Sequence, residues 1–298
     1  MDAVWANIEE DEWGEAACAS LASLQQSYEY GEICGSFGLE VMRARLTQES
    51  EQGYAQVLVR SAFGGRRLAL LSRGPIWPDG VDRDVVSSAA LHKTIPMSRA
   101  SIMMATPNGL APLVGIPMMS GATVAEISLM EDDTAQRAFM HGKWRNRLVQ
   151  SEGMDLNVEP IAPTPALIEM LLARDAKQQK RRGYRNLPPR FLRRWAEHYP
   201  EKTHILVSRS CGKINAAMVF LRHGGTATYH LGWREVEAHI PVHNLMLWQG
   251  MRLLAHLNIK RLDLGLLDTH NSPNLARFKL GSGARARCIG KTYLLRSS

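Results

Sequence analysis

The sequence predicts a mixed α+β fold in two domains, and three features of the chain support this prediction. The segments "THILVSRS", "INAAMVFLR" and "TATYHLGW" are strand candidates, and turns that contain Gly212 and Gly224 separate them. Glycine readily adopts the positive φ that tight hairpin turns require, so these segments indicate an antiparallel meander. The second feature is the apolar periodicity of residues 242–258, and the third is a proline-rich segment near residue 160.

The second half of the chain continues from the meander into a helix. Leu245, Trp248 and Met251 recur at helical spacing in "VHNLMLWQGMRLLAHLN", which indicates a helix with a broad apolar stripe. A short strand "KRLDLGLL", a short helix over residues 274–279 and a last strand "RCIGKTYLL" follow. The expected order is three antiparallel strands, helix, strand, short helix and strand.

The first half has its own mixed pattern of helices and strands. Helices are expected for "LASLQQSYEYGE", "DVVSSAALHKTI" and the long basic segment "DTAQRAFMHGKWRNRLVQSEG", and strands for "GYAQVLVR", "RRLALLSRGPIW" and "TVAEISLM". The proline-rich "EPIAPTPAL" comes next and marks the seam between the domains. We therefore expect domains over residues 1–159 and 160–298, each a largely antiparallel mixed sheet flanked by helices.

The composition is that of a globular protein with a basic bias. The 298 residues are 45% hydrophobic and 22% charged, and the formal net charge is +7. Basic residues gather in "KQQKRRGYR" and "ARARCIGK", whereas the N-terminal segment is acidic. This asymmetry suits an anionic partner such as RNA, a nucleotide-bearing substrate or a phosphorylated lipid, and a solvated helix face explains it equally well.

Several classes of protein are not expected. Four scattered cysteines and the absence of an apolar leader indicate a cytoplasmic protein with reduced thiols. Prolines and glycines interrupt the uncharged residues 100–125, so we expect a buried strand and loop there, or an apolar lip over a groove, and no membrane span. No phosphate-binding or hydrolase motif occurs, and Pro241 between His239 and His243 argues against a helical metal pair. We expect neither a metal nor a cofactor.

Seven segments, in this order, resemble the Fem-type branch of the GCN5-related N-acetyltransferase (GNAT) superfamily. They are "SLQQSYEYGE", "LALLSRGPIW", "HGKWRNRLVQSEG", "GKINAAMVF", "ATYHLGW", "NLMLWQGMRLLAHLNIKRLDLG" and "LARFKLGSG". The resemblance implies two GNAT-like domains in tandem and transfer of an acyl group to an amine. In Fem enzymes the donor is an aminoacyl-tRNA and the acceptor is an amine of a peptidoglycan precursor, whereas other members of the superfamily use acyl-coenzyme A.

Lys279 matches the family lysine that is proposed to stabilise the oxyanion formed when an amine attacks an ester or thioester. A fixed cation aimed at that oxygen lowers the barrier. Phe278 precedes it as in the family, and Gly281 and Gly283 would allow a close approach of the backbone. The alternative is a solvated lysine at the end of a short helix. We prefer the catalytic interpretation.

The resemblance also suggests residues that bind substrate. Tyr229 aligns with a family tyrosine of the substrate cleft, Trp233 lies in the same segment, and Arg73 lies at the family's R-G-P strand end. Arg182 aligns with an arginine that contacts substrate phosphates, which suits its planar guanidinium. Core packing for Tyr229 and simple exposure for Arg182 remain alternatives.

Asp79 is the candidate base that would deprotonate or orient the attacking amine. It lies in "PDG", and an aspartate in such a turn needs no catalytic role, so the turn is the better interpretation.

One departure from the family concerns the acceptor. "YEYGEICGSFG" lacks the lysine with which family members hold the phosphates of a nucleotide sugar, so the sequence leaves a nucleotide-linked acceptor open.

The donor is also left open by the sequence. The glycine-rich segment with which this fold binds coenzyme A is absent, whereas "KQQKRRGYR" with "KWRNR" could supply a basic track for tRNA. We therefore expect an aminoacyl-tRNA donor, with acyl-coenzyme A as the second choice, and a non-catalytic module that binds RNA or another anion as the alternative from another class. An amine-bearing acceptor, no DNA, and peripheral contact with a membrane-linked substrate complete the expected partners.

Overall fold

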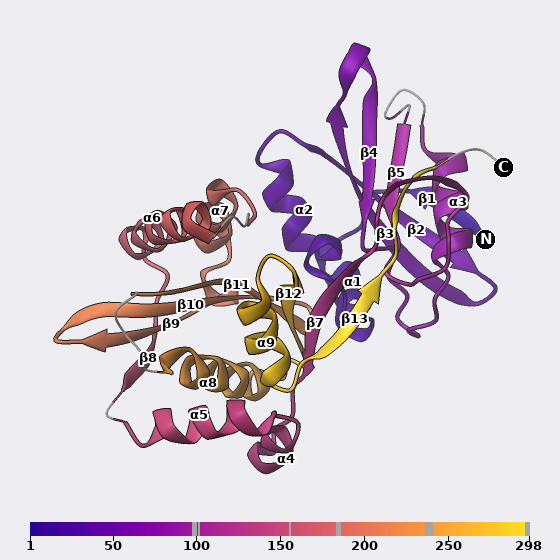
Figure 1. The fold of residues 1–298 in the computed structure, drawn as a ribbon. Helices are drawn as coiled ribbons and strands as arrows, with labels where there is room; N and C mark the ends of the chain where they lie inside the picture. Colours follow the sequence, from indigo (N-terminus) through magenta and orange to yellow (C-terminus); the bar gives the residue numbers. More distant parts are fainter. Residues whose placement is uncertain (97–99, 101, 155, 183–185, 236–240, 296–298) are drawn as a thin grey trace. The chain divides into compact units, whose positions relative to one another are not determined.

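Two seven-stranded sheets, each flanked by helices, organise the chain (Figure 1). The structure is a computed structural model and describes residues 1–96, 100, 102–154, 156–182, 186–235 and 241–295. Unit 1 is formed by Met1–Thr123, His223–Thr226 and Arg287–Ser298, and unit 2 by Val124–Arg222 and Ala227–Ala286. The predicted mixed α+β class is confirmed.

Unit 1 combines a mostly antiparallel sheet with three α-helices among its described residues. The sheet order is β1-β2-β3-β4-β5-β14-β6, and only the pair β4–β5 is parallel among the paired strands described. The elements are β1 (Asp2–Trp5), α1 (Glu10–Ala19), α2 (Tyr28–Gly35), β2 (Glu40–Gln48), β3 (Glu51–Ser61), β4 (Arg67–Ser72), α3 (Asp84–Thr94), β5 (Ile102–Thr106), β6 (Gly115–Met119) and β14 (Thr292–Leu295).

Unit 2 contains the second sheet, in the order β13-β7-β12-β11-β10-β9-β8. Its elements are β7 (Ala122–Ser128), α4 (Asp133–Ala138), α5 (Gly142–Glu152), β8 (Asn157–Ile161), α6 (Pro165–Arg182), α7 (Pro189–His198), β9 (Thr203–Ser210), β10 (Lys213–His223), β11 (Thr226–Arg234), α8 (Val242–His256), β12 (Arg261–Leu266), α9 (Pro273–Gly281) and β13 (Arg285–Ile289). The predicted meander is confirmed, and Gly212 and Gly224 adopt positive φ at its two turns. Helices α6 and α7 were not predicted.

The same order of elements occurs in both units. Strand β1, helices α1 and α2, strands β2 to β4, helix α3 and strand β5 correspond in order to β8, α6, α7, β9 to β11, α8 and β12. The strand order in the sheets matches as well, as β1-β2-β3-β4-β5 and β8-β9-β10-β11-β12. The structure therefore contains the predicted tandem arrangement, although the two halves show no recognisable repeat in sequence.

Each sheet also contains one strand from the other half of the sequence. Strand β14, at the C-terminal end, lies between β5 and β6, and β7, which follows β6 in the chain, lies between β12 and β13. The single last strand predicted for "RCIGKTYLL" is therefore wrong, because β13 ends at Ile289 and β14 begins at Thr292 in the other sheet. The break includes Gly290, where a Cβ atom would lie 2.5 Å from Cγ of Pro107.

The division by packing differs from the predicted boundary near residue 160. Residues 124–159 pack with unit 2, because β7 pairs with β12 and β8 pairs with β9. The proline-rich segment does not act as a linker. Pro160 lies in β8 opposite Leu206, and Pro165 begins α6. Proline is tolerated in β8 because this strand is at the edge of the sheet.

Two predicted helices are interrupted. In residues 21–32, Ser27 is extended and its side chain caps α2, after a short 3₁₀ turn over Leu24–Gln26. The predicted basic helix over residues 133–153 is two helices, α4 and α5. His141 between them is extended, and its N–H donates to the carbonyl of Gly281 at 3.0 Å. Helical periodicity alone does not reveal that Ser27 and His141 are the N-cap residues at which α2 and α5 begin.

The uncharged residues 100–125 divide into a buried and an exposed part. Strand β5 contributes Met103 and Ala105 to the core of unit 1, which agrees with the preferred interpretation. Most of residues 110–121 are exposed, which the sequence analysis did not predict. Within the described residues no helix combines the length and the apolar character needed to span a membrane.

Helices cover both faces of the sheet in unit 2 (Figure 1). On one face, Trp144 of α5 and Met246 of α8 join a core with Met218 and Phe220 of β10. On the other, helices α6 and α7 pack, and the ring of Phe191 in α7 lies 6.2 Å from that of His230 on β11. The basic segments of α5 and α6 therefore lie on opposite faces of the sheet.

Replacement of Gly250 in α8 by alanine should destabilise the protein. A Cβ atom there would lie 2.5 Å from Cζ of the fully buried Phe220, so the ring or the helix must shift. Overpacking of this kind lowers the free energy of unfolding by about 1–3 kcal/mol. Urea denaturation measures the change. Gly142→Ala is the control, because nothing lies within 4 Å of the added atom. Equal stability of the two variants would contradict the packing described here.

Candidate active site

The buried side chain of Lys279 is the centre of the candidate site. Helix α9 places it so that only 6% of the residue is exposed, and Nζ donates a hydrogen bond of 2.8 Å to the carbonyl oxygen of Leu266. An ammonium group has three N–H donors. Among the described residues no other hydrogen-bond partner of Nζ is found. The site therefore holds a buried cation with donors available for another acceptor.

The surroundings of Lys279 shift its protonation. Burial lowers the pKa of the amine from 10.5 to about 8, and the carboxylate of Asp263 opposes this shift by raising it. Desolvation disfavours the charged form, and a nearby opposite charge favours it. With a pKa of about 8, the amine is still mostly an ammonium ion at pH 7. It can then donate hydrogen bonds to an oxygen that gains negative charge.

An irregularity in β12 brings the Leu266 carbonyl to Lys279. The register between β12 and β7 shifts between Asp263 and Leu266, and Gly265 within it has φ +76°. The Asp263 carboxylate accepts a hydrogen bond of 2.7 Å from the N–H of Gly265 and so holds the turn. A Cβ at Gly265 would lie 3.9 Å from Nζ of Lys279. Glycine is suited to this position because of its positive φ.

Phe278, Gly281 and Gly283 determine how α9 packs against its neighbours. The ring of Phe278 lies 6.0 Å from that of Trp144 and 6.4 Å from that of His243. A Cβ at Gly281 would lie 2.8 Å from Cδ1 of Trp144, and one at Gly283 3.1 Å from Cβ of Phe139. The space beside both glycines is thus filled by the protein's own aromatic residues. The absence of a side chain at Gly281 and Gly283 therefore lets α9 pack closely on these aromatic residues. The expectation was that it would let a substrate come close to the backbone.

Tyr229 and Trp233 lie on β11. Tyr229 is half-buried, its ring lies 5.9 Å from that of Phe220, and a Cβ at Gly232 would collide with its hydroxyl. Trp233 is buried, and the guanidinium of Arg174 lies over its ring, 4.9 Å from the ring centre. This is a cation–π contact.

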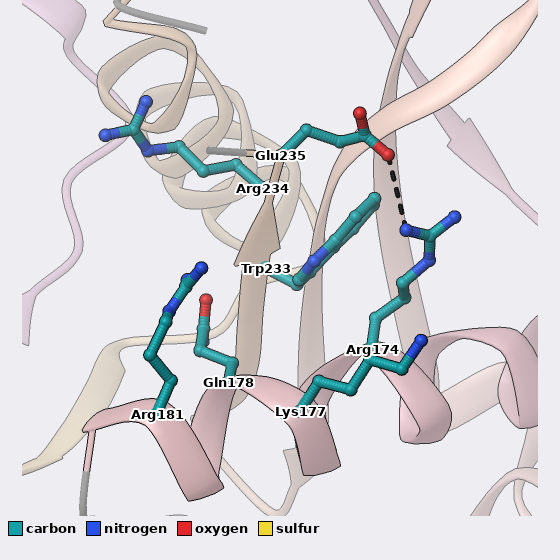
Figure 2. A pocket seen from close by; sticks show the side chains of 7 residues that line it. All are labelled: Arg174, Lys177, Gln178, Arg181, Trp233, Arg234 and Glu235. Atoms are coloured by element: carbon teal, nitrogen blue, oxygen red, sulfur yellow. Dashed lines mark hydrogen bonds and ion pairs between the residues drawn. The ribbon is translucent and has the colours of Figure 1, made fainter. Parts of the chain in front are cut away.

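A pocket of about 280 Å³ lies between α6 and the end of β11 (Figure 2). Glu235 pairs with Arg174 at 3.3 Å, and Gln178 donates to the carbonyl of Gly232 at 2.8 Å. Lys177 and Arg181 are exposed and have no ion pair among the described residues. With four cations and one carboxylate the pocket suits an anion. It is lined by Arg174, Lys177, Gln178, Arg181, Trp233, Arg234 and Glu235.

His243 lies near one residue of the pocket and near one neighbour of Lys279. Its Nε2 lies 3.1 Å from the carbonyl oxygen of Trp233, and its ring centre lies 6.4 Å from that of Phe278, the residue before Lys279. In the sequence, His243 stood out only for its spacing from His239, a metal pair that Pro241 argued against, and His239 lies outside the described residues. Among the described residues no cluster of histidine, cysteine or acidic side chains could hold a metal ion.

Arg182 is the last residue of α6, directly after the pocket residue Arg181. Its side chain lies outside the described part of the structure, as do residues 183–185 of the same basic segment. The segment "KQQKRRGYR" therefore supplies the described pocket residues Lys177, Gln178 and Arg181. Arg174 and Arg234, which the sequence analysis did not select, complete the cations. No local sequence signal relates them, because they come from α6 and β11.

Arg73 and Asp79 belong to unit 1. Arg73 has φ +53° after β4, and its N–H donates to the carbonyl of Thr106 at 2.9 Å. Asp79 accepts hydrogen bonds from both terminal nitrogens of Arg83 at 2.8 and 2.7 Å. These bonds hold the pKa of Asp79 below its usual value, which makes it a poor base. The ion pair with Arg83 gives Asp79 a structural role in the turn, which was the preferred interpretation.

Comparisons with known proteins identify the class of domain and the fold. Residues 141–279 match the family described as acetyltransferase (GNAT) domain. The matched segment begins just before α5, includes the pocket and ends at Lys279. The fold and the matched domain define the chain as an acyltransferase with a GNAT domain. A comparison with curated protein sequences finds no significant match.

Three solved structures share the tandem fold. FemX is 11% identical, with a TM-score of 0.78 over 99% of this chain and 98% of FemX. A tandem GNAT protein from the clavulanic acid biosynthesis pathway is 11% identical, with a TM-score of 0.53 over 100% and 98%. L-PGS from Bacillus licheniformis is 13% identical, with a TM-score of 0.51 over 82% and 81%. The fold is thus Fem-like along nearly the whole chain.

The lowered pKa of Lys279 has a consequence for stability. Because its folded pKa of about 8 is below the ordinary 10.5, the unfolded chain binds more protons between these values. The free energy of unfolding should therefore rise by about 1–2 kcal/mol between pH 8 and pH 9.5 in the wild type relative to Lys279→Met. Urea denaturation at several pH values measures this difference. Lys143→Met, which removes an exposed lysine, is the control and should follow the wild type. Parallel curves for wild type and Lys279→Met would contradict the pKa shift.

Proposed function

We propose that this acyltransferase moves an aminoacyl group from an aminoacyl-tRNA to the amine of a peptide or cell-wall precursor. The observation that carries the proposal is the buried ammonium of Lys279, which has donors left after its bond to Leu266. Such a cation is suited to a reaction that creates negative charge on an oxygen. Preorganised donors of this kind act most strongly where water is excluded.

The proposed step forms a C–N bond and breaks a C–O bond. The lone pair of the acceptor amine attacks the carbonyl carbon of the ester, and the carbonyl oxygen becomes an oxyanion that accepts a hydrogen bond from Nζ of Lys279. Collapse of this intermediate expels the ribose oxygen of the tRNA. The proton lost by the amine balances the proton gained by that leaving oxygen. Asp79, in its ion pair with Arg83, is not assigned to this transfer.

The pocket beside α6 supports a phosphate-bearing donor. Its cations come from α6 and β11 and line the same pocket, and we assign to it a phosphate of the nucleic acid (Figure 2). Guanidinium groups bind phosphates with paired hydrogen bonds. Trp233 in the same pocket offers an apolar surface, although Arg174 already covers one part of it. His243 contacts Trp233 of the pocket and lies near Phe278, the neighbour of Lys279. We assign to it the role of holding these two residues in place while the ester carbonyl reacts.

Acyl-coenzyme A is the second candidate donor. One structural relative is a tandem GNAT protein described as solved without AcCoA, and the same pocket cations would suit the phosphates of that molecule. The resemblance of the chain's sequence segments to Fem enzymes supports the Fem-type donor. The α5 basic segment is on the other face of the sheet, so we assign tRNA contact to α6 alone and not to the two segments together.

Lys279→Met should lower kcat by roughly 10²–10³, because the oxyanion loses its fixed donor. Steady-state rates with charged tRNA and with acetyl-coenzyme A, offered separately, measure the effect and identify the donor. The variant should still bind the donor. An unchanged rate would indicate a different catalytic group, absence of transfer by the wild type would favour the non-catalytic module, and transfer from the thioester alone would overturn the choice of tRNA.

The pH dependence tests the charge on Lys279. Activity that needs the ammonium should fall as pH rises above about 8, since the amine then loses its proton. Hydroxylamine is a suitable acceptor because it is already neutral at pH 7, so its own titration does not obscure the fall. In Lys279→Arg, which stays protonated, the remaining activity should show no such fall. A wild-type rate that is constant from pH 7 to pH 10 would refute the role of the ammonium.

The pocket is tested by removal of its free cations. Lys177→Gln together with Arg181→Gln should weaken tRNA binding. It should also make the slope of the logarithm of the binding constant against the logarithm of salt concentration shallower by roughly the amount expected for two phosphate contacts. Fluorescence anisotropy at several salt concentrations measures both quantities. The control replaces two exposed cations of α5, Lys143 and Arg145, by glutamine and leaves the same net charge. Equal losses in both variants would indicate nonspecific attraction and contradict the assignment.

A further inference from the structure

An exposed apolar surface lies along β6 and the loop that leads into it. We call the residues Leu110, Val114, Ile116, Met118 and Met119 the β6 patch, and their exposed fractions range from 37% to 67%. The segment from 100 to 125 contains no charged residue. Scattered exposed apolar residues are normal on proteins, but a contiguous uncharged group of this kind indicates a site of interaction.

The β6 patch exposes apolar side chains on both sides of one strand. The pairing with β14 skips Met118, so Ile116 and Met119, opposite Leu294 and Thr292, lie on one face, Pro117, opposite Tyr293, lies on the other, and Met118 is the extra residue of the irregularity. All four are exposed. A second protein that packs on the sheet would cover one face and leave the other in water. A medium that surrounds the edge covers both.

Strand β6 is also poorly suited to pairing with another strand. It is the last strand of its sheet, with β14 as its only neighbour in the described topology. Pro117 in its middle has no N–H to donate. Proteins use proline at sheet edges to prevent pairing with further strands. A second copy of the chain that adds a strand at β6 is therefore the weaker candidate.

The two ends of the β6 patch differ in charge: one has an exposed lysine, and the other has an arginine with two aspartates beside it. Lys291 is exposed and precedes Thr292, which lies opposite Met119 in the sheet. Arg287 donates at 3.1 Å to the carbonyl oxygen of Asn108, two residues before Leu110. At this end Asp84, which accepts a hydrogen bond from Gly109, is buried, and the exposed Asp82 places a carboxylate oxygen where it would collide with a Cβ of Gly109. The end of the β6 patch at Lys291 therefore combines exposed apolar side chains with a cation, and a cation near an anionic membrane surface strengthens binding to it.

We propose that the β6 patch inserts shallowly into the interface of a membrane that contains anionic lipids. The apolar side chains on both faces of β6 enter the boundary between headgroups and acyl chains, and Lys291 contacts the headgroups. This contact is peripheral. It does not depend on the donor or on the transfer reaction, because it is measured as binding.

Sedimentation of the full chain with vesicles tests the proposal. Vesicles of phosphatidylcholine with phosphatidylglycerol should bind the wild type, and pure phosphatidylcholine vesicles should bind it less. Met118→Asn with Met119→Asn should weaken binding at least tenfold without any change in charge. The matched control replaces two equally exposed valines elsewhere, Val4 and Val149, by asparagine and should bind as the wild type. Circular dichroism verifies that both variants are folded.

Each other outcome overturns the proposal. Equal binding of both double variants would mean that the basic residues of the chain attract the vesicles without insertion. Absence of wild-type binding would remove the membrane as partner. A dimer in light scattering that the methionine variant loses, without loss of vesicle binding, would show that β6 is instead a contact between copies.

Discussion

The burial of the Lys279 ammonium against the Leu266 carbonyl is the constraint around which the candidate site is built. To bury the cation, α9 packs closely on Trp144, which requires glycine at 281. To present the carbonyl, β12 departs from regular register at Gly265, and Asp263 holds that turn and attracts the ammonium. A buried charge with incomplete hydrogen bonding is unfavourable for folding, and such groups concentrate where a protein uses them.

The elements of the tandem fold differ in how well the sequence predicts them. The meander over β9 to β11, helix α8 and helix α9 were predicted correctly, because their periodicity and turn glycines are local signals. The exchange of β7 and β14 between the sheets has no local signal, since it depends on pairing with strands that are distant in the sequence. For this reason "RCIGKTYLL" was interpreted as one strand, and the division of the chain was expected near residue 160 rather than at residues 123 and 124.

The candidate site was predictable where a family motif marks it. Lys279 and Phe278 were found through the resemblance of "LARFKLGSG", and part of the pocket through the charge of "KQQKRRGYR". Arg234 and His243 were missed in these roles, because their significance comes from packing of β11 and α8 against distant elements. Gly281 and Gly283 were assigned to substrate approach, but the volume beside each is filled by an aromatic residue. Sequence identified the chemical groups, and tertiary structure determined their neighbours.

The pKa of Lys279 itself, measured by NMR titration of its labelled side chain, tests the central claim most directly. A buried ammonium that is kept ready for an oxyanion should titrate near 8 in the free protein. A bound phosphonate that mimics the tetrahedral intermediate should raise this pKa, since a nearby negative charge favours the ammonium. A value near 10.5 that does not respond to the phosphonate would show a solvated lysine and contradict the account.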